Sequence, residues 1–311
     1  MGHDRWEPKL RVKASGLGGS GYRIPTRLDD KGKPILVPGV TTALGALDKG
    51  GIVQWAVNNT AAYCAANLEY LKDRDEEQRY GFLRWYHTRM KEKDFDDPSI
   101  DVRDYSNGVL NDLAELGTMT HDWVADYLND YFPEELIRDE QTDMVNAFLE
   151  WYEANDVEVI ATEVTVVGPG WAGTLDLILR INGVVYLVDL KTSRAIRESH
   201  YAQLSALGSA ESMMVQVDKD HPGAVEYDSK RWGKTYWIEE PLPAFSKYAV
   251  LHMRPGDWDM RGTYIEPFCE LKVIPDNVIQ AAFGMFQGSL MARHSQRNIK
   301  YALKEYPADE G

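Results

Sequence analysis

The sequence is poor in cysteine, in long apolar runs and in net positive charge. Its 311 residues include two cysteines, Cys64 and Cys269. Two thiols are too few for a disulfide framework, a cysteine-based zinc site or an iron–sulfur cluster, so none of these is expected. No apolar run approaches the roughly 18 residues of a membrane-spanning helix, and the first residues lack the layout of a signal peptide. The sequence therefore predicts a cytoplasmic protein with no membrane partner.

The shortage of positive charge narrows the function classes. The formal net charge is −15, from 34 basic and 49 acidic residues. This argues against a protein that coats nucleic acid, because such domains are usually basic. An enzyme needs only a local positive lining along its groove. Three basic stretches could supply it, unless they are only solvated helix faces and a loop: residues 84–93, residues 230–234, and the last helix from Arg293 to Lys304.

The hydrophobic periodicity predicts an α/β fold in which a helix, three strands, a helix and a further strand follow one another. Helices are expected at 52–72, 76–92, 108–132, 139–154, 195–214 and 275–303. Strands are expected at 22–27, 34–37, 157–167, 171–181, 184–191, 248–253 and 262–266, with an irregular β insertion at about 215–247. Residues 1–21 are expected to be a loosely held arm, residues 94–104 an acidic connector and residues 305–311 a disordered tail. The expected organisation is an N-terminal arm, hairpin and helical cover (1–105), a core (106–275), and a C-terminal helix with its tail (276–311).

One hairpin carries most of the chemical information. Two apolar runs flank the pair Asn182-Gly183, the strongest short-range signal for a two-residue hairpin turn. Counting outward from this turn along both strands places Asp176 directly opposite Asp189. Cross-strand partners lie about 4.5–5.5 Å apart, where like charges destabilise a sheet. Lys191 shares the face of Asp189, because side chains alternate with a period of two. The hairpin therefore predicts a divalent-cation site.

These residue types suit chemistry on a phosphoryl group. Two carboxylates together with substrate oxygens suffice for Mg²⁺, which keeps several of its waters. A metal held there would orient a water and offset charge that builds on a phosphoryl group. Lys191 would stay protonated beside the acids and stabilise that charge or help orient the water. The competing explanations are strand-edge carboxylates that face water and an ordinary surface lysine.

Three further candidates remain open on spacing alone. Glu163 lies in the middle of a strand, either on a solvated face or as a third carboxylate that reaches the metal. His121 falls on the inward stripe of its helix, as a core histidine or as a ligand. Gly117, one turn earlier, would let that helix approach the sheet. Gln203 follows Lys191 on the next helix and is either a surface residue or a hydrogen-bond partner for a water or a phosphate.

Taken together, the motifs resemble the RecB-like branch of the PD-(D/E)XK nuclease superfamily, and most closely the phage exonucleases akin to the CRISPR-associated ones. The sharp motifs lie within residues 117–207, and the likeness extends over about 35–300. Four segments carry it: Gly117-Thr118-Met119-Thr120-His121 as a G-x-x-x-H helix, Gly173-Thr174-Leu175-Asp176 as a G-x-x-D strand, Asp189-Leu190-Lys191-Thr192 as D-x-K-T, and Gln203 at the start of a Q-x-x-x-Y helix. Residues 37–42 with Trp55 are similar to an early segment of the phage members.

The resemblance implies a restriction-endonuclease-like α/β core and a metal-dependent DNA exonuclease. It implies one or two Mg²⁺ or Mn²⁺ ions and single-stranded DNA or duplex ends as substrate. The implied metal ligands are His121, Asp176, Asp189 and Leu190, and the implied catalytic residues are Asp176, Asp189, Lys191, Glu163 and Gln203. A role in phage recombination, repair or replication in the host cytoplasm would follow, with a recombination or single-strand-binding protein as a candidate partner.

Two departures from the family pattern stand out. Leu207 occupies the position of the tyrosine in Q-x-x-x-Y, so that residue's DNA contact is either absent or supplied by Tyr201. Many relatives carry four cysteines for an iron–sulfur cluster, which this chain cannot hold. The alternatives are an endonuclease or nickase of the same superfamily, an inactive nucleic-acid-binding relative, and a metal hydrolase acting on a small phosphoester.

Overall fold

The computed structural model of the chain describes residues 9–14, 19–47, 102–133, 135–136, 138–258 and 263–305. The chain divides into two compact units, one formed by residues 1–47 with 117–311 and the other by residues 48–116. The helices predicted at 52–72 and 76–92 lie outside the described residues, as do Cys64, the basic stretch 84–93 and the tail 306–311. None of the described helices combines the length and apolar character that a membrane span requires.

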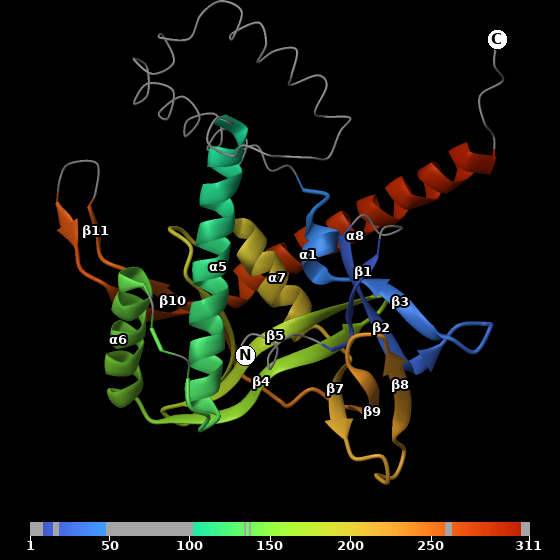
Figure 1. Cartoon of the computed structure of the whole chain (residues 1–311), viewed down its shortest axis with the longest axis horizontal. Coiled ribbons are helices and arrows are strands. Elements are labelled where there is room, and N and C mark those ends of the chain that lie inside the picture. The colour runs from blue at the N-terminus through green and yellow to red at the C-terminus, as the bar shows by residue number, and fades with distance from the viewer. Residues whose placement is uncertain are drawn as a thin grey trace, which may run out of the picture. The chain divides into compact units, whose positions relative to one another are not determined.

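The larger unit is an α/β structure with an eight-stranded mixed sheet (Figure 1). The strand order is β13-β10-β6-β5-β4-β7-β9-β8, and β10 runs parallel to β6 while the other neighbours are antiparallel. The strands are β4 (Val157–Gly168), β5 (Trp171–Ile181), β6 (Val184–Lys191), β7 (Ser212–Val217), β8 (Val225–Ser229), β9 (Gly233–Glu240), β10 (Lys247–Arg254) and β13 (Phe268–Ile274). β11 (Asp257–Trp258) and β12 (Tyr264–Ile265) form a separate small hairpin.

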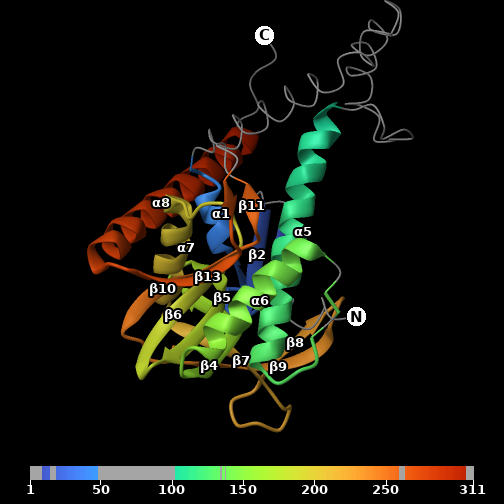
Figure 2. The ribbon, with the colours of Figure 1, turned by 90° about the vertical axis from the view of Figure 1, so that its left-hand side faces the viewer.

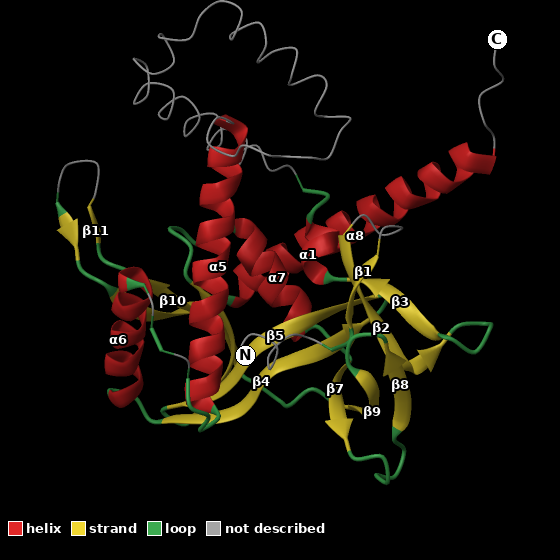
Figure 3. Ribbon diagram, viewed as in Figure 1, coloured by secondary structure: helices red, strands yellow, loops and turns green. Residues whose placement is uncertain are grey.

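Five helices occur among the described residues (Figure 3). They are α1 (Val40–Leu44), α5 (Val102–Leu128), α6 (Asp139–Glu153), α7 (Glu198–Gly208) and α8 (Asp276–Glu305). Helix α7 packs on β5 and β6, and α8 lies on α7 and α1 (Figure 2). The apolar core between them includes Trp171, whose ring meets that of Phe286 edge to face at 5.3 Å. Helix α6 packs along β10 and β13.

The N-terminal arm is more ordered than the sequence suggested. Part of it forms a three-stranded sheet of β1 (Arg11–Ala14), β2 (Gly19–Leu28) and β3 (Pro34–Pro38). A half-buried ion pair fixes β2 to the main sheet, with Arg27 Nη2 2.5 Å from Glu239 Oε1. Ser212 and Thr26 also donate hydrogen bonds to the Glu239 carboxylate. The expectation of a loose arm over 1–21 is wrong for 11–14 and 19–21, because these residues pair with one another as β1 and β2.

Three predicted boundaries also need correction. The helix expected at 195–214 ends at Gly208, and residues 212–217 form strand β7 instead. Its residues pair with β4 and β9, and this pairing decides the conformation over the weak helical preference of the segment. The insertion expected at 215–247 thus begins at 212 and extends the main sheet. Helix α5 begins at Val102 rather than 108, so the expected acidic connector overlaps its first turn.

Candidate metal centre

The hairpin register agrees with the sequence prediction. Five residue pairs join β5 and β6, from Ile181 opposite Val184 to Leu177 opposite Val188. Both turn residues, at positions 182 and 183, have positive φ, 49° and 81°, as a tight primed turn requires. The next step in this register sets Asp176 against Asp189.

Glu163 of β4 is a third acid that lies in line with Asp176 and Asp189 across the neighbouring strands. These three acids are called the row below. Its neighbours Thr162 and Val164 pair with Leu177 and Leu175, which leaves Glu163 opposite Asp176. Glu163 has φ of 49°, a left-handed conformation that costs a non-glycine residue about 1–3 kcal/mol. Such strain inside a strand interrupts the pairing and is typical of functional sites. The solvated-face explanation of Glu163 is therefore disfavoured, since its side chain is only partly exposed and approaches Asp176.

Helix α5 supplies the histidine. Nδ1 of His121 lies 3.9 Å from Oδ2 of Asp176. A Cβ at Gly117 would lie 3.1 Å from Oγ1 of Thr192, so glycine at this position permits the close approach that the sequence suggested. Asn129, directly after the end of α5, exchanges hydrogen bonds with Thr162 of β4. These contacts hold the C-terminal half of α5 beside β4 and β5 (Figures 1 and 2).

Three side chains meet in a geometry that could hold a metal ion. One ligand atom each of His121, Glu163 and Asp176 lies within 4.8 Å of the other two. Besides approaching His121 and Glu163, the Asp176 carboxylate accepts a hydrogen bond from the Leu190 backbone N–H at 2.9 Å. This bond fixes the carboxylate where β5 and β6 stop pairing. The triad is thus held by three separate elements, α5, β4 and β5.

Asp189 lies in a second, deeper position beside this triad. Its side chain is 1% exposed, and its Oδ2 forms an ion pair with Nζ of Lys191 at 2.6 Å. Among the described residues no backbone N–H or hydroxyl group donates to either Asp189 oxygen. Lys191 Nζ also lies 3.3 Å from the Leu190 carbonyl oxygen. Asp189 therefore positions the ammonium group of Lys191 next to the triad and keeps acceptor capacity of its own.

The raised pKa values of the three acids indicate that their negative charge is not fully balanced by neighbouring positive charge. Burial, followed by the charge of Asp176, raises the pKa of Glu163 well above its usual value. Burial likewise raises the pKa of Asp176 and of Asp189. Burial by itself would lower the pKa of Lys191, but the surrounding carboxylates outweigh it and raise that pKa. Burial and the Lys191 charge lower the pKa of His121 to about 4, so the imidazole is neutral and can act as a ligand near pH 7.

A divalent cation fits this donor set. With three carboxylates ionised and Lys191 protonated, two negative charges are uncompensated, which matches the charge of one divalent ion. Two carboxylates and an imidazole within reach of one point form an open ligand set that leaves room for water or substrate oxygens. The buried Asp189 oxygens without N–H or hydroxyl donors are a further sign that a cation completes the site.

The remaining predicted residues have different positions. Leu190 contributes backbone groups alone, with its N–H on Asp176 and its carbonyl oxygen near Lys191. Gln203 lies on α7, and no hydrogen bond to its amide is found among the described residues. Its role stays a prediction. Leu207, where the family pattern has tyrosine, is buried in the core and would meet a Cβ at Gly173 at 2.7 Å.

Two residues near the site were not identified from the sequence. Tyr22 of β2 is buried, and its hydroxyl lies 2.9 Å from Oγ1 of Thr174. Burial raises the Tyr22 pKa, and the charges of Glu163 and Asp176 raise it further. His200 of α7 has its pKa lowered to about 4 by burial and by the charge of Lys191. Tyr22 gave no local signal, whereas the position of His200 one turn before Gln203 could have indicated it.

The strain and the raised pKa of Glu163 predict the direction in which its replacement changes the melting temperature. Glu163→Gln is expected to raise the melting temperature of the chelated protein at pH 8 by about 2–4 °C per kcal/mol of relieved repulsion. A raised folded-state pKa means that ionisation costs stability as pH rises above the usual value of 4.5, so the gain should vanish near pH 4. With excess Mn²⁺ the sign should reverse, because the variant no longer has this ligand. Calorimetry at the two pH values checks this.

The matched control is Glu226→Gln. Glu226 is fully exposed, and hydrogen bonds from Lys234 and Tyr236 lower its pKa, so this change should give no gain at pH 8 and no response to Mn²⁺. A Glu163→Gln variant that melts at the same or a lower temperature than the chelated wild type at pH 8 would contradict the crowding of carboxylates described above.

No protein-family model matches the chain, and no curated protein matches it. The arrangement of the side chains themselves is therefore the basis for assigning a function.

Proposed function

We propose that this protein is a metal-dependent deoxyribonuclease of the RecB-like PD-(D/E)XK type, acting as an exonuclease on DNA ends or single strands. The observation that carries the proposal is the row of Glu163, Asp176 and Asp189 across three adjacent strands, with Lys191 paired to Asp189 and His121 beside Asp176. The order of elements supports it as well. Helices α5 and α6 precede the antiparallel strands β4–β6. After α7 and the inserted strands β7–β9, β10 returns parallel to β6.

The residues have separable roles in phosphodiester hydrolysis. His121, Glu163 and Asp176 would hold Mg²⁺ or Mn²⁺, with Asp189 as a further acidic group behind them. When bound, the metal supplies a Lewis acid that polarises a phosphoryl oxygen and activates water. Lys191, held in place by Asp189, donates to a non-bridging oxygen of the scissile phosphate and stabilises the charge that develops there. The neutral His121 has one ring nitrogen without a proton, which can bind the metal, and one N–H, which suits its hydrogen bond to the backbone of Leu190.

The mixed donor set bears on which metal the site prefers. Carboxylates suit Mg²⁺ and Mn²⁺ alike, whereas an imidazole ligand is better tolerated by the softer Mn²⁺. We therefore expect activity with both ions and a higher affinity for Mn²⁺.

A comparison of linear and circular DNA tests the proposal. The full-length protein should degrade end-labelled linear DNA with Mg²⁺ or Mn²⁺, leave covalently closed circles intact, and lose all activity in EDTA. Asp189→Ala should abolish the activity. Asp220→Asn, an exposed acid in the loop between β7 and β8, is the matched control and should act like wild type.

Each other outcome identifies an alternative. Cutting or nicking of circles would replace the exonuclease by an endonuclease or nickase. Tight DNA binding without cleavage under any metal would indicate an inactive binding relative. Cleavage that persists undiminished in Asp189→Ala would remove the proposed mechanism.

A further inference from the structure

Helix α8 has an outer half that the core does not use. Its inner half is buried through Ile279, Ala282 and Phe286, and Ser289 Oγ donates a 2.6 Å hydrogen bond to the carbonyl oxygen of Ala43. From residue 291 to residue 300 every residue is exposed except residue 293, which is half-buried. A surface helix usually shows charges of both signs on such a face. The outer half of α8, residues 291–300, does not.

The charge of α8 is one-sided. No aspartate or glutamate occurs between Asp276 and Glu305, although the chain contains 49 acidic residues. Arg293, Arg297 and Lys300 follow one another at spacings of four and three, which places them on one face of the helix. A positive stripe therefore lies on a protein whose net charge is −15.

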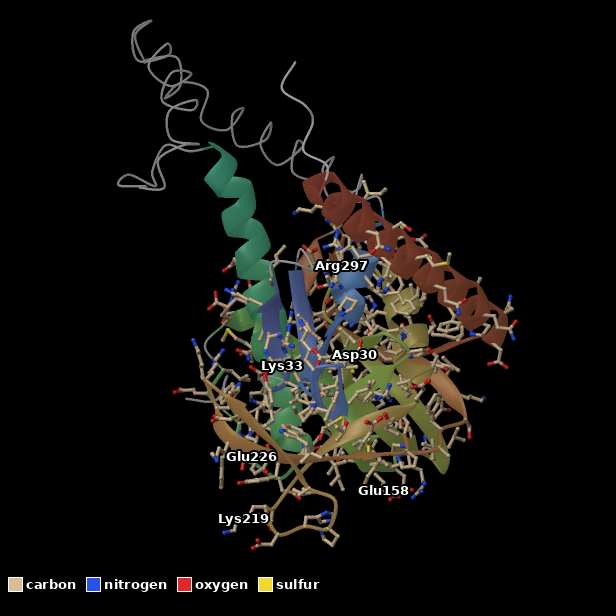
Figure 4. All side chains as sticks on the ribbon, turned by 90° about the vertical axis from the view of Figure 1, so that its right-hand side faces the viewer. Asp30, Lys33, Glu158, Lys219, Glu226 and Arg297 are labelled. Carbon is tan, nitrogen blue, oxygen red and sulfur yellow. The ribbon has the colours of Figure 1, made fainter. Side chains whose placement is uncertain are left out.

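The stripe borders a hollow in the surface. Arg293, His294 and Arg297 line this hollow together with Pro38 at the end of β3. Figure 4 shows Arg297 on the side of α8 that faces α1 and the N-terminal strands. The surface of the hollow is almost entirely apolar, and the outer half of α8 beside it carries the guanidinium and imidazole groups. This donor set suits phosphate oxygens, which arginine binds bidentately.

We propose that the outer half of α8 binds the sugar–phosphate backbone of the nucleic-acid substrate. The inference deepens the proposed function and rests on it. A strongly acidic protein with a row of carboxylates at its centre repels a polyanion, and a positive face on the same unit offsets that repulsion and retains the strand. The contacts are to phosphates, so they carry no base specificity, as a nuclease that degrades any sequence requires.

Binding of a fluorescent oligonucleotide to the full-length protein in EDTA tests this inference. The double change Arg293→Glu with Arg297→Glu should weaken binding at least tenfold. The dependence of log Kd on log salt should become flatter by about 1.4–1.8, since each phosphate that an arginine neutralises adds about 0.7–0.9 to that slope. Lys31→Glu with Lys33→Glu, on the exposed β2–β3 turn, makes the same change in net charge and should weaken binding less than twofold.

The outcomes separate this inference from the proposed function. If wild type cleaves DNA but both double variants bind equally, the α8 inference fails and the nuclease stands. If wild type neither binds nor cleaves DNA, both fail. If the α8 charges are needed for binding to vesicles of phosphatidylserine and phosphatidylcholine but not for binding to DNA, the face serves a lipid surface and the inference is overturned. Should the glutamate variant not fold by circular dichroism, Arg293→Gln with Arg297→Gln gives the same comparison with a smaller loss, of at least threefold.

Discussion

Asp176→Asn is expected to lower the rate of DNA hydrolysis at least about 1,000-fold. A metal contributes several kcal/mol of charge stabilisation to the transition state, and each 1.36 kcal/mol corresponds to a factor of about ten in rate. Asp176 is the central acid of the site. It approaches both His121 and Glu163, and it accepts a hydrogen bond from the Leu190 N–H. Asparagine keeps the shape and can still accept that hydrogen bond, but it removes the charge. Single-turnover cleavage of end-labelled DNA with saturating Mn²⁺ measures the loss.

The Asp176→Asn variant should still fold, so its loss of activity can be assigned to the site and not to unfolding. Because burial raises the pKa of Asp176, the neutral amide is expected to leave the chelated protein as stable as wild type or more stable. The protection against heat that Mn²⁺ gives to wild type should be reduced. Asp220→Asn again serves as the control, with wild-type cleavage and wild-type protection by metal. A rate within tenfold of wild type for Asp176→Asn would contradict a role in metal binding.

The hairpin shows how much a local signal can predict. The Asn-Gly turn fixed the register of β5 and β6, and with it the position of Asp176 relative to Asp189, because a two-residue loop allows a single pairing. The strands β4–β6 and the helix at 139–153 were likewise predicted closely, since their periodicity is strong and local. The strand β7 was missed because its conformation depends on pairing with β4 and β9, which are distant in sequence.

The site itself could be predicted only in part, for a related reason. Sequence spacing placed Glu163 in a strand, but the left-handed backbone that aims it at Asp176 is a property of the assembled sheet. The triad therefore includes Glu163 together with His121 and Asp176, while Asp189 pairs with Lys191. Tyr22 reaches the acids from a strand that lies about 150 residues earlier, through its contact with Thr174. No local pattern encodes such a contact.

Lys191→Met is expected to destabilise the protein by about 3–5 kcal/mol and to lower DNA hydrolysis about 100- to 1,000-fold. The loss of stability arises because Asp189, which is 1% exposed, would remain buried without its ion-pair partner. Methionine is close in length and shape to the lysine stem, so the effect on packing is small. The loss of rate arises because the ammonium group that stabilises the scissile phosphate beside the metal is gone. Urea unfolding and single-turnover kinetics measure the two effects separately.

A second substitution separates the two effects of Lys191. In the double variant Lys191→Met with Asp189→Asn, the buried charge is gone, so most of the stability should return, since removing both members of a buried ion pair is often nearly neutral. The rate should not return, because the phosphate still lacks the ammonium group of Lys191. Non-additive stability with unrecovered activity is therefore the signature of an aspartate that holds a catalytic lysine in place. If the double variant is less stable than Lys191→Met alone, Asp189 has a structural role of its own; if it regains activity, Lys191 is not the group that stabilises the phosphate.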